Sequence, residues 1–191
     1  MNYDFHVVGI GLSAGGLDPL LEIVADLPRD IGAAFVIVAH VPINAPSSLD
    51  VILSKATPLK VMTVSTIEYV EPGHMYVMAA GKEIILVDGF VQIRERNPQE
   101  KINKTVDIFF KSLAADAKDK SIGIVLSGAG HDGIEGAKSI EDYNGLVIVQ
   151  DPETAKFPLM PGNLIANDHP DYVLKPEDIA KRIVARIQER V

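Results

Sequence analysis

The sequence predicts an α/β fold in which a doubly wound, mostly parallel sheet is flanked by helices. Short apolar runs of strand length alternate with segments whose apolar residues recur at helical spacing, a pattern typical of βαβ units. Two of the apolar runs lead through glycine-rich turns into helical segments. A chain of 191 residues can bury roughly 70% of its unfolded surface, so we expect residues 1–191 to form a single domain.

The first elements follow this alternation closely. A strand, a glycine-rich turn and a helix come first, and a continuous apolar strand and a second helix follow. Unbroken apolar runs are typical of parallel strands that are buried on both faces. We expect these elements at residues 6–10, 11–16, 17–27 and 34–38, with the second helix capped by Ser47 or Ser48.

The middle of the chain predicts an antiparallel hairpin excursion from the main sheet around residues 58–95. Asp88-Gly89 stands between two short apolar runs, and this dipeptide is a strong signal for a two-residue hairpin turn. The strand candidates in this region are residues 60–65, 75–79, 83–87 and 90–93.

The second half returns to the helix and strand alternation. Asp107 lies near the start of the first of these helices, where a negative charge is favourable. The last helix has Pro176 at its first position and acidic residues in its first turn. We expect helices at 106–117, 133–142 and 176–190, and strands at 122–126 and 146–149.

The composition excludes several classes of function. The chain carries 18 basic and 26 acidic residues, a net charge of −8, which argues against nucleic-acid binding. It contains no cysteine, which excludes disulfides, thiolate metal sites and cysteine nucleophiles. The apolar stretch at residues 33–39 is far shorter than the ~20 residues that a membrane-spanning helix needs. We expect a soluble, cytoplasmic protein without membrane insertion.

Three strand-end loops carry residues suited to catalysis. Ser13 and His40 follow the first two predicted strands, and Asp132 lies in the turn after a later strand, where α/β folds place their sites. A serine needs a base to take its proton, and His40 can do so while Asp132 orients the imidazole. Each residue also has a structural interpretation, as a helix cap, a loop hydrogen-bonding partner or a turn residue.

Two other kinds of site fit the sequence less well. Residues 9–14 meet the loose form of a dinucleotide fingerprint, but His40 stands where an acidic residue would bind the ribose. A metal site made of His40, His131 and Asp132 lacks the usual ligand spacing. We therefore expect no cofactor and no metal, and dinucleotide binding stays a weak alternative.

The motifs, taken in order, resemble the catalytic domain of the CheB protein-glutamate methylesterases. The family's G-A-S-T-G-G motif is similar to residues 11–16, its Q-H-M-P segment to 39–42 and its L-T-G-M-G-x-D-G motif to 126–133. Its L-x-P-G-x-x-Y-x-A-P-G stretch resembles residues 70–81. The resemblance runs from about Val7 to Ile187 and is closest to the CheB-like domains fused to receptor methyltransferases.

The resemblance implies a carboxylic ester hydrolase of chemotaxis signalling that removes methyl esters from receptor glutamates; many members also deamidate glutamines. It makes Ser13 the nucleophile, His40 the general base and Asp132 the orienting carboxylate. Expected partners are a methylated receptor or sensor protein, with a methyltransferase or a separate receiver domain as further candidates, and no receiver domain is expected in this chain. Oxyanion and substrate binding is expected from the backbone of Ala14, Gly15, Gly16, Ala129 and Gly130.

Several residues near the site differ from the family's pattern. Ala14 stands in place of threonine, Ala39 in place of glutamine and Ala129 in place of methionine. Residues 103–105 read Asn-Lys-Thr where the family usually has Arg-Pro-Ser. The alternative function is therefore a CheB-like binding or scaffold module that keeps the fold without catalysis.

Overall fold

The computed structural model describes residues 3–41, 48–96, 99 and 102–189. Its central sheet has seven strands in the order β10-β9-β8-β1-β2-β5-β3. Every pairing within it is parallel, which confirms the predicted sheet. The strands are β1 (His6–Leu12), β2 (Ala33–Ala39), β3 (Lys60–Val64), β5 (His74–Met78), β8 (Ser121–Val125), β9 (Leu146–Gln150) and β10 (Tyr172–Leu174).

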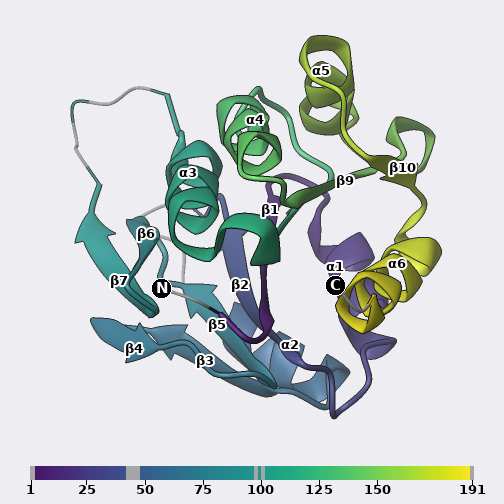
Figure 1. The fold of residues 1–191 in the computed structure, drawn as a ribbon. Helices are drawn as coiled ribbons and strands as arrows, with labels where there is room; N and C mark the ends of the chain where they lie inside the picture. The colour runs from purple at the N-terminus through teal and green to yellow at the C-terminus, as the bar shows by residue number, and fades with distance from the viewer. Residues whose placement is uncertain (1–2, 42–47, 97–98, 100–101, 190–191) are drawn as a thin grey trace.

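Helices cover both faces of the sheet, as Figure 1 shows, so the fold is doubly wound. Along β1, Val7 belongs to the core on one face, while Val8 and Ile10 belong to the core on the other. Burial on both faces explains why the strand sequences are apolar throughout. One face carries α3 (Thr105–Ala117), α4 (Ile134–Asp142) and α5 (Leu159–Asn167), and the other carries α1 (Leu17–Ala25), α2 (Leu49–Ala56) and α6 (Pro176–Gln188).

Two glycines of β1 let α3 approach the sheet closely. A Cβ atom added at Gly9 would lie 2.7 Å from Phe109 Cε1, and one added at Gly11 would lie 2.4 Å from Val106 Cγ1. Both distances are too short for real side chains. Gly9 and Gly11 belong to the loose dinucleotide fingerprint, but side chains of α3 fill the space beside them. This close packing sets the height of the α3 N-terminus above the strand ends.

The predicted antiparallel hairpin is present, but it is smaller than residues 58–95. β6 (Lys82–Val87) and β7 (Phe90–Glu95) flank the Asp88-Gly89 turn, and β4 (Ile67–Tyr69) pairs with β7 to complete a three-stranded sheet. The strand candidates at 60–65 and 75–79 correspond to β3 and β5, which pair in parallel in the main sheet. Assigning them to the excursion was wrong, because the composition of a short strand does not reveal which edge it pairs with.

The other predicted elements are confirmed, with ends that shift by a few residues. Ser48 occupies the N-cap position of α2, but its side chain makes no capping hydrogen bond, and Ser47 lies outside the described residues. The sequence analysis missed α5, because Pro161 and Gly162 near its start are poor helix formers. In the described part of the chain, none of the helices has the length and apolar character needed to cross a membrane.

Candidate active site

Ser13 and His40 emerge side by side from the carboxyl ends of β1 and β2. The parallel register pairs Leu12 with Ala39, so the next residue of each strand is Ser13 and His40. The His40 N–H donates to the Leu12 carbonyl oxygen at 3.0 Å, which extends this pairing beyond the sheet. Both residues line a cavity of about 270 Å³ with otherwise mostly apolar walls. The structure thus brings together the serine and histidine selected from the sequence.

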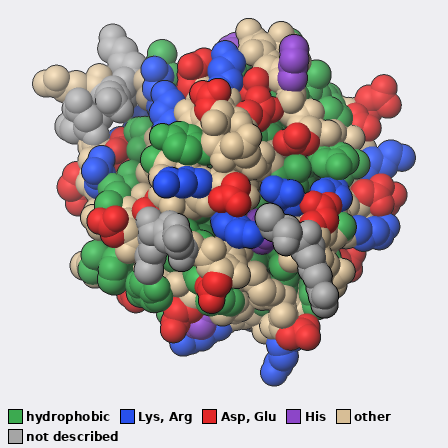
Figure 2. All heavy atoms as spheres, in the orientation of Figure 1, with side chains coloured by type: hydrophobic (Ala, Val, Ile, Leu, Met, Phe, Trp, Pro, Cys, Tyr) green, Lys and Arg blue, Asp and Glu red, His purple; other side chains and the backbone are tan. Residues whose placement is uncertain are grey.

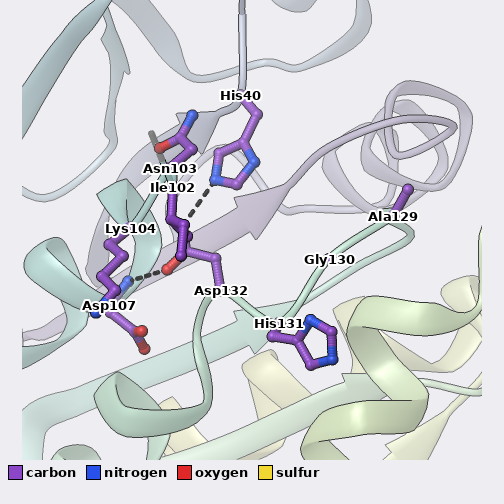
Figure 3. Close-up of a pocket in the computed structure, with 9 residues that line it drawn as sticks. All are labelled: His40, Ile102, Asn103, Lys104, Asp107, Ala129, Gly130, His131 and Asp132. Carbon is purple, nitrogen blue, oxygen red and sulfur yellow. Dashed lines mark hydrogen bonds and ion pairs between the residues drawn. The ribbon is translucent and has the colours of Figure 1, made fainter. Parts of the chain in front are cut away.

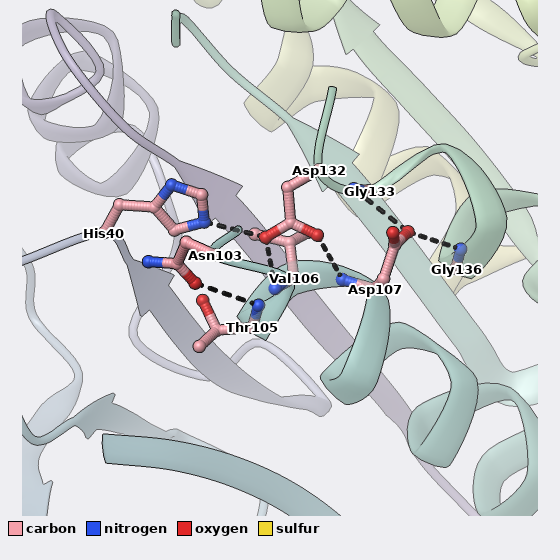
Figure 4. A network of polar contacts seen from close by, with 8 residues as sticks. All are labelled: His40, Asn103, Thr105, Val106, Asp107, Asp132, Gly133 and Gly136. Carbon is pink, nitrogen blue, oxygen red and sulfur yellow. Dashed lines mark hydrogen bonds and ion pairs between the residues drawn. The ribbon is translucent and has the colours of Figure 1, made fainter. Parts of the chain in front are cut away.

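Asp132 reaches His40 from the other side. It lies in the loop after β8, and β8 is the neighbour of β1 opposite β2. The distance between His40 Nε2 and Asp132 Oδ2 is 2.7 Å (Figure 4). The Asp132 side chain is only 2% exposed and that of His40 15%. A buried carboxylate in contact with the ring is the arrangement that fixes the orientation of a histidine base.

The contacts of Asp132 assign the proton on His40. Besides the imidazole, the carboxylate accepts the N–H groups of Val106 and Asp107, each at 2.8 Å, at the N-terminus of α3. An ionised carboxylate can only accept hydrogen bonds, so each group that contacts its oxygens must be a donor. We therefore place a proton on His40 Nε2, which leaves the lone pair on Nδ1 free to act as a base.

The backbone around Ser13 offers several N–H groups. Those of Ala14, Gly15, Ala129 and Gly130 donate no hydrogen bond within the described residues. The Gly16 N–H, by contrast, donates to the Ser13 carbonyl oxygen at 3.0 Å and closes the turn. Of the five expected oxyanion residues, Gly16 is therefore the one whose N–H is already used.

Ser127 connects the loops around Ser13, a role that the sequence analysis did not assign. The residue is fully buried, and its carbonyl oxygen accepts the Ser13 N–H at 3.0 Å. Its hydroxyl donates to the Ala14 carbonyl oxygen at 2.9 Å and accepts the Phe157 N–H at 3.0 Å. Its own N–H donates to Gln150 Oε1. The sequence offered one signal for this role: Ser127 is part of the motif at 126–133, and no function had been assigned to it.

A second cavity, of about 540 Å³, opens beside the His40–Asp132 pair (Figure 3). Ala129 and Gly130 form part of its wall, and Lys104 and His131 contribute positive or titratable groups. Figure 3 shows the His131 ring directed away from His40 and Asp132. Among the described residues, no group of three or more histidine or acidic side chains is placed to hold a metal ion.

Asp107 also lines this cavity and is buried. Burial raises the pKa of its carboxyl, and the nearby charge of Asp132 adds to the increase. The N–H groups of Gly136 and Gly133 and the Lys111 ammonium lower the pKa and so act in the opposite direction. The sequence analysis interpreted Asp107 only as a residue suited to a helix start, and missed its place beside Asp132.

Charge is mixed on the face of the molecule that Figure 2 shows. On the face shown in Figure 2, acidic and basic side chains are interspersed, with apolar side chains between them. Although the whole chain has a net charge of −8, the acidic side chains on this face do not form one continuous negative patch.

Comparison with known proteins decides the family. The family model for CheB methylesterase matches residues 8–183, which is most of the chain. The chain belongs to the CheB methylesterase family. The match includes all the loops that carry Ser13, His40 and Asp132.

Relatives and a solved structure agree with this assignment. A Leptospira interrogans protein, provisionally named a protein-glutamate methylesterase/protein-glutamine glutaminase, is 32% identical over 96% of this chain and 95% of its own length. The protein of that name from Moorella thermoacetica is also 32% identical, but the match covers 44% of it. The crystal structure of the Thermotoga maritima CheB methylesterase catalytic domain superposes with a TM-score of 0.85 at 32% identity, covering 96% of this chain and 99% of that one.

Proposed function

We propose that this CheB-family chain is a serine esterase that hydrolyses glutamate methyl esters on chemoreceptor-like signalling proteins, with Ser13, His40 and Asp132 as its catalytic residues. Family membership supports ester hydrolysis. The observation that carries the choice of residues is the 2.7 Å contact between His40 and Asp132, beside a cavity that His40 shares with Ser13.

Acylation follows from the assigned proton positions. The Ser13 oxygen attacks the ester carbonyl carbon while His40 Nδ1 takes the hydroxyl proton. Asp132 stabilises the imidazolium that forms. The tetrahedral intermediate then collapses, the bond to the methoxy group breaks, and His40 gives the proton to the departing methoxy oxygen, which leaves as methanol. The product is an acyl-enzyme on Ser13.

The negative charge of the tetrahedral intermediate is held by backbone donors. The N–H groups of Ala14, Gly15, Ala129 and Gly130 lie in the two loops beside the nucleophile and have no partner among the described residues. One well-aimed donor of this kind stabilises the transition state by roughly 3–4 kcal/mol. Side chains at these positions need not take part, so alanine at 14 and 129 is compatible with the step.

Deacylation repeats the same proton transfers with water. His40 Nδ1 accepts a proton from water as its oxygen attacks the acyl carbon, and the bond to Ser13 then breaks as His40 returns the proton to the serine oxygen. The product is a free glutamate side chain. With a glutamine substrate the same sequence releases ammonia in place of methanol, and this would make the chain a glutaminase as well.

We also propose that residues 1–191 form one methylesterase domain that acts in the cytoplasm. The match to the Leptospira interrogans relative, which covers 96% of this chain and 95% of that protein, supports the single domain. The substrate partner would be a methylated receptor or sensor protein, and a methyltransferase or a separate receiver domain are candidates for further partners. The proposed reaction needs no cofactor, because all its proton transfers use protein groups and water.

The experiment measures methanol release from methylated receptor membranes, together with labelling by an active-site serine phosphonate probe. We expect turnover and labelling of Ser13 in the unchanged protein. We expect Ser13→Ala to lose both, and His40→Gln and Asp132→Asn to lower turnover by at least about 10³-fold. Turnover by Ser13→Ala equal to that of the unchanged protein would exclude the proposed nucleophile.

Two variants serve as matched controls. Ser54→Ala removes an exposed hydroxyl on α2, and His169→Gln removes an exposed imidazole that precedes the amino end of β10. Both should retain full turnover. If the unchanged protein releases no methanol and its Ser13 stays unlabelled, the alternative of a CheB-like binding module replaces the esterase.

A further inference from the structure

Two aspartates bind the starts of α3 and α4 reciprocally: Asp132 accepts N–H groups of α3, and Asp107 of α3 accepts N–H groups at the start of α4 (Figure 4). Asp132, from the loop before α4, accepts the N–H groups of Val106 and Asp107 in the first turn of α3. Asp107 in turn accepts the N–H groups of Gly133 and Gly136 at the start of α4, at 3.0 and 2.8 Å. Each helix thus satisfies N–H groups of the other with a carboxylate, since the first N–H groups of a helix have no partner within it.

The packing leaves little freedom for this exchange. A Cβ atom at Gly136 would lie 2.5 Å from Phe110 Cβ and 3.1 Å from Asp107 Cα, so the two helices are in close contact at this point. Gly133 has a φ of 104°, a value that only glycine adopts easily, and it lies directly after Asp132. The backbone that carries Asp132 is therefore held from its C-terminal side by the Asp107 carboxylate.

We propose that Asp107 is a positioning residue for the reaction: by binding the Gly133 and Gly136 N–H groups, it holds the loop that places Asp132 against His40. The proposal rests on the proposed function for its consequence in catalysis. Asp107 touches neither the substrate nor the reacting atoms in this account. It acts on Asp132 in two ways. Its backbone N–H donates to the Asp132 carboxylate, and its own carboxylate binds the loop that carries Asp132.

The chemistry of the site explains why this support matters. Asp132 holds the imidazole with its Nε2 proton, and the His40–Asp132 contact of 2.7 Å depends on the position of one carboxylate oxygen. Without Asp107, the Gly133 and Gly136 N–H groups would lose their acceptor in a buried place, and the loop would move to find another. A displacement of about 1 Å in a catalytic group can lower a rate by about 10²-fold.

The test compares Asp107→Ala, which removes both hydrogen bonds, with Asp107→Asn, whose amide oxygen can accept them. We expect Asp107→Ala to lower kcat for ester hydrolysis by roughly 10- to 100-fold with KM nearly unchanged. We expect Asp107→Asn to recover most of kcat. Should Asp107→Ala fail to fold, Asp107→Ser replaces it, since serine is compatible with a helix start but too short to reach both N–H groups.

A second readout does not depend on activity. The proton on His40 Nε2, hydrogen-bonded to Asp132, gives a separate downfield NMR resonance, which His40→Gln identifies by removing it. We expect this resonance to broaden or shift in Asp107→Ala and to return in Asp107→Asn. If the protein proved inactive, the proposed function would fail while this measurement still tested the positioning of Asp132.

Asp116→Ala is the matched control. Asp116 is another carboxylate of α3 and is partly buried; it also accepts two backbone N–H groups, those of Asp88 and Gly89 in the β6–β7 turn. Its loss should lower stability and leave kcat and the His40 resonance in place. Unchanged kcat and resonance in a folded Asp107→Ala or Asp107→Ser protein would overturn the proposal. So would an Asp107→Asn protein as impaired as Asp107→Ala.

Discussion

The hydroxyl of Ser127 donates a hydrogen bond to the carbonyl oxygen of Ala14, 2.9 Å away. The two residues are separated by 113 positions in the sequence, and the same hydroxyl accepts the N–H of Phe157 at 3.0 Å. One buried side chain therefore joins the turn that carries Ser13, the loop after β8 and the segment before α5. The position of Ser13 depends on this junction as well as on β1.

We expect Ser127→Ala to lower the free energy of unfolding by about 1–3 kcal/mol, because the partly buried hydrogen bonds of its hydroxyl to the backbone of Ala14 and Phe157 are lost. Turnover should also fall, since the turn around Ser13 loosens. Urea unfolding and methanol release measure the two effects. The control is Ser139→Ala, which removes a hydroxyl bonded within α4 and should change stability by no more than about 0.5 kcal/mol. Equal effects of the two substitutions would contradict the role of Ser127.

Gly11→Ala tests the close approach of α3 to β1. The new methyl group would lie 2.4 Å from Val106 Cγ1, and we expect a loss of about 1–3 kcal/mol in the free energy of unfolding. Turnover should fall too, because the Val106 N–H binds Asp132 and would move with the helix. In the control Gly32→Ala, the nearest side-chain atom lies 3.8 Å from the new methyl group. That variant should unfold at nearly the same urea concentration as the unchanged protein.

The raised pKa of Glu141 predicts that the protein loses stability as pH rises. Its Oε1 atom and Asp168 Oδ2 are buried and have no hydrogen-bond partner among the described residues. Burial, followed by the charge of Asp168, raises the pKa of Glu141 from 4.5 to about 7, while His169 lowers it. The folded state therefore binds a proton more tightly than the unfolded state, and this contribution to stability is lost as pH rises from about 4.5 to about 7.

Thermal unfolding across this pH range checks the effect with Glu141→Gln, which cannot ionise. Relative to the unchanged protein, the variant should be more stable above pH 7 than it is below pH 4.5. Glu135→Gln, which alters an exposed glutamate of the same helix, should show no such difference. A pH-independent difference for Glu141→Gln would refute the assignment.

His6 predicts a pH dependence of the opposite sign. Burial, followed by the charges of Lys120 and Arg186, lowers the pKa of its imidazole from 6.5 to about 4, against smaller opposing effects of Asp119 and Glu189. Between these values the unfolded state binds more protons than the folded state, so stability falls as pH drops from 6.5 to about 4. Chemical unfolding of His6→Asn should show a weaker decrease over this range. A decrease as steep as that of the unchanged protein would rule out His6 as its source.

Local sequence patterns were sufficient for most of the fold. The unbroken apolar runs that became β1, β2, β8 and β9 have few alternatives to buried parallel strands, because both of their faces must leave water. β3 and β5 were assigned to the wrong sheet, since pairing partners are chosen by contacts distant in sequence. The helix α5 was missed because tertiary packing of Met160 and Leu164 compensates for a weak helix-forming sequence.

The sequence by itself determined that Ser13 and His40 lie at one end of the sheet, because each directly follows a buried parallel strand. It also suggested Asp132 as their partner. Only the tertiary structure decided that Asp132 meets His40 through Nε2, that the Gly16 N–H is already used, and that Asp107 and Ser127 hold the loops. Hydrogen bonds between loops join residues far apart in the chain, and their geometry is set by how the helices pack on the sheet rather than by any local pattern.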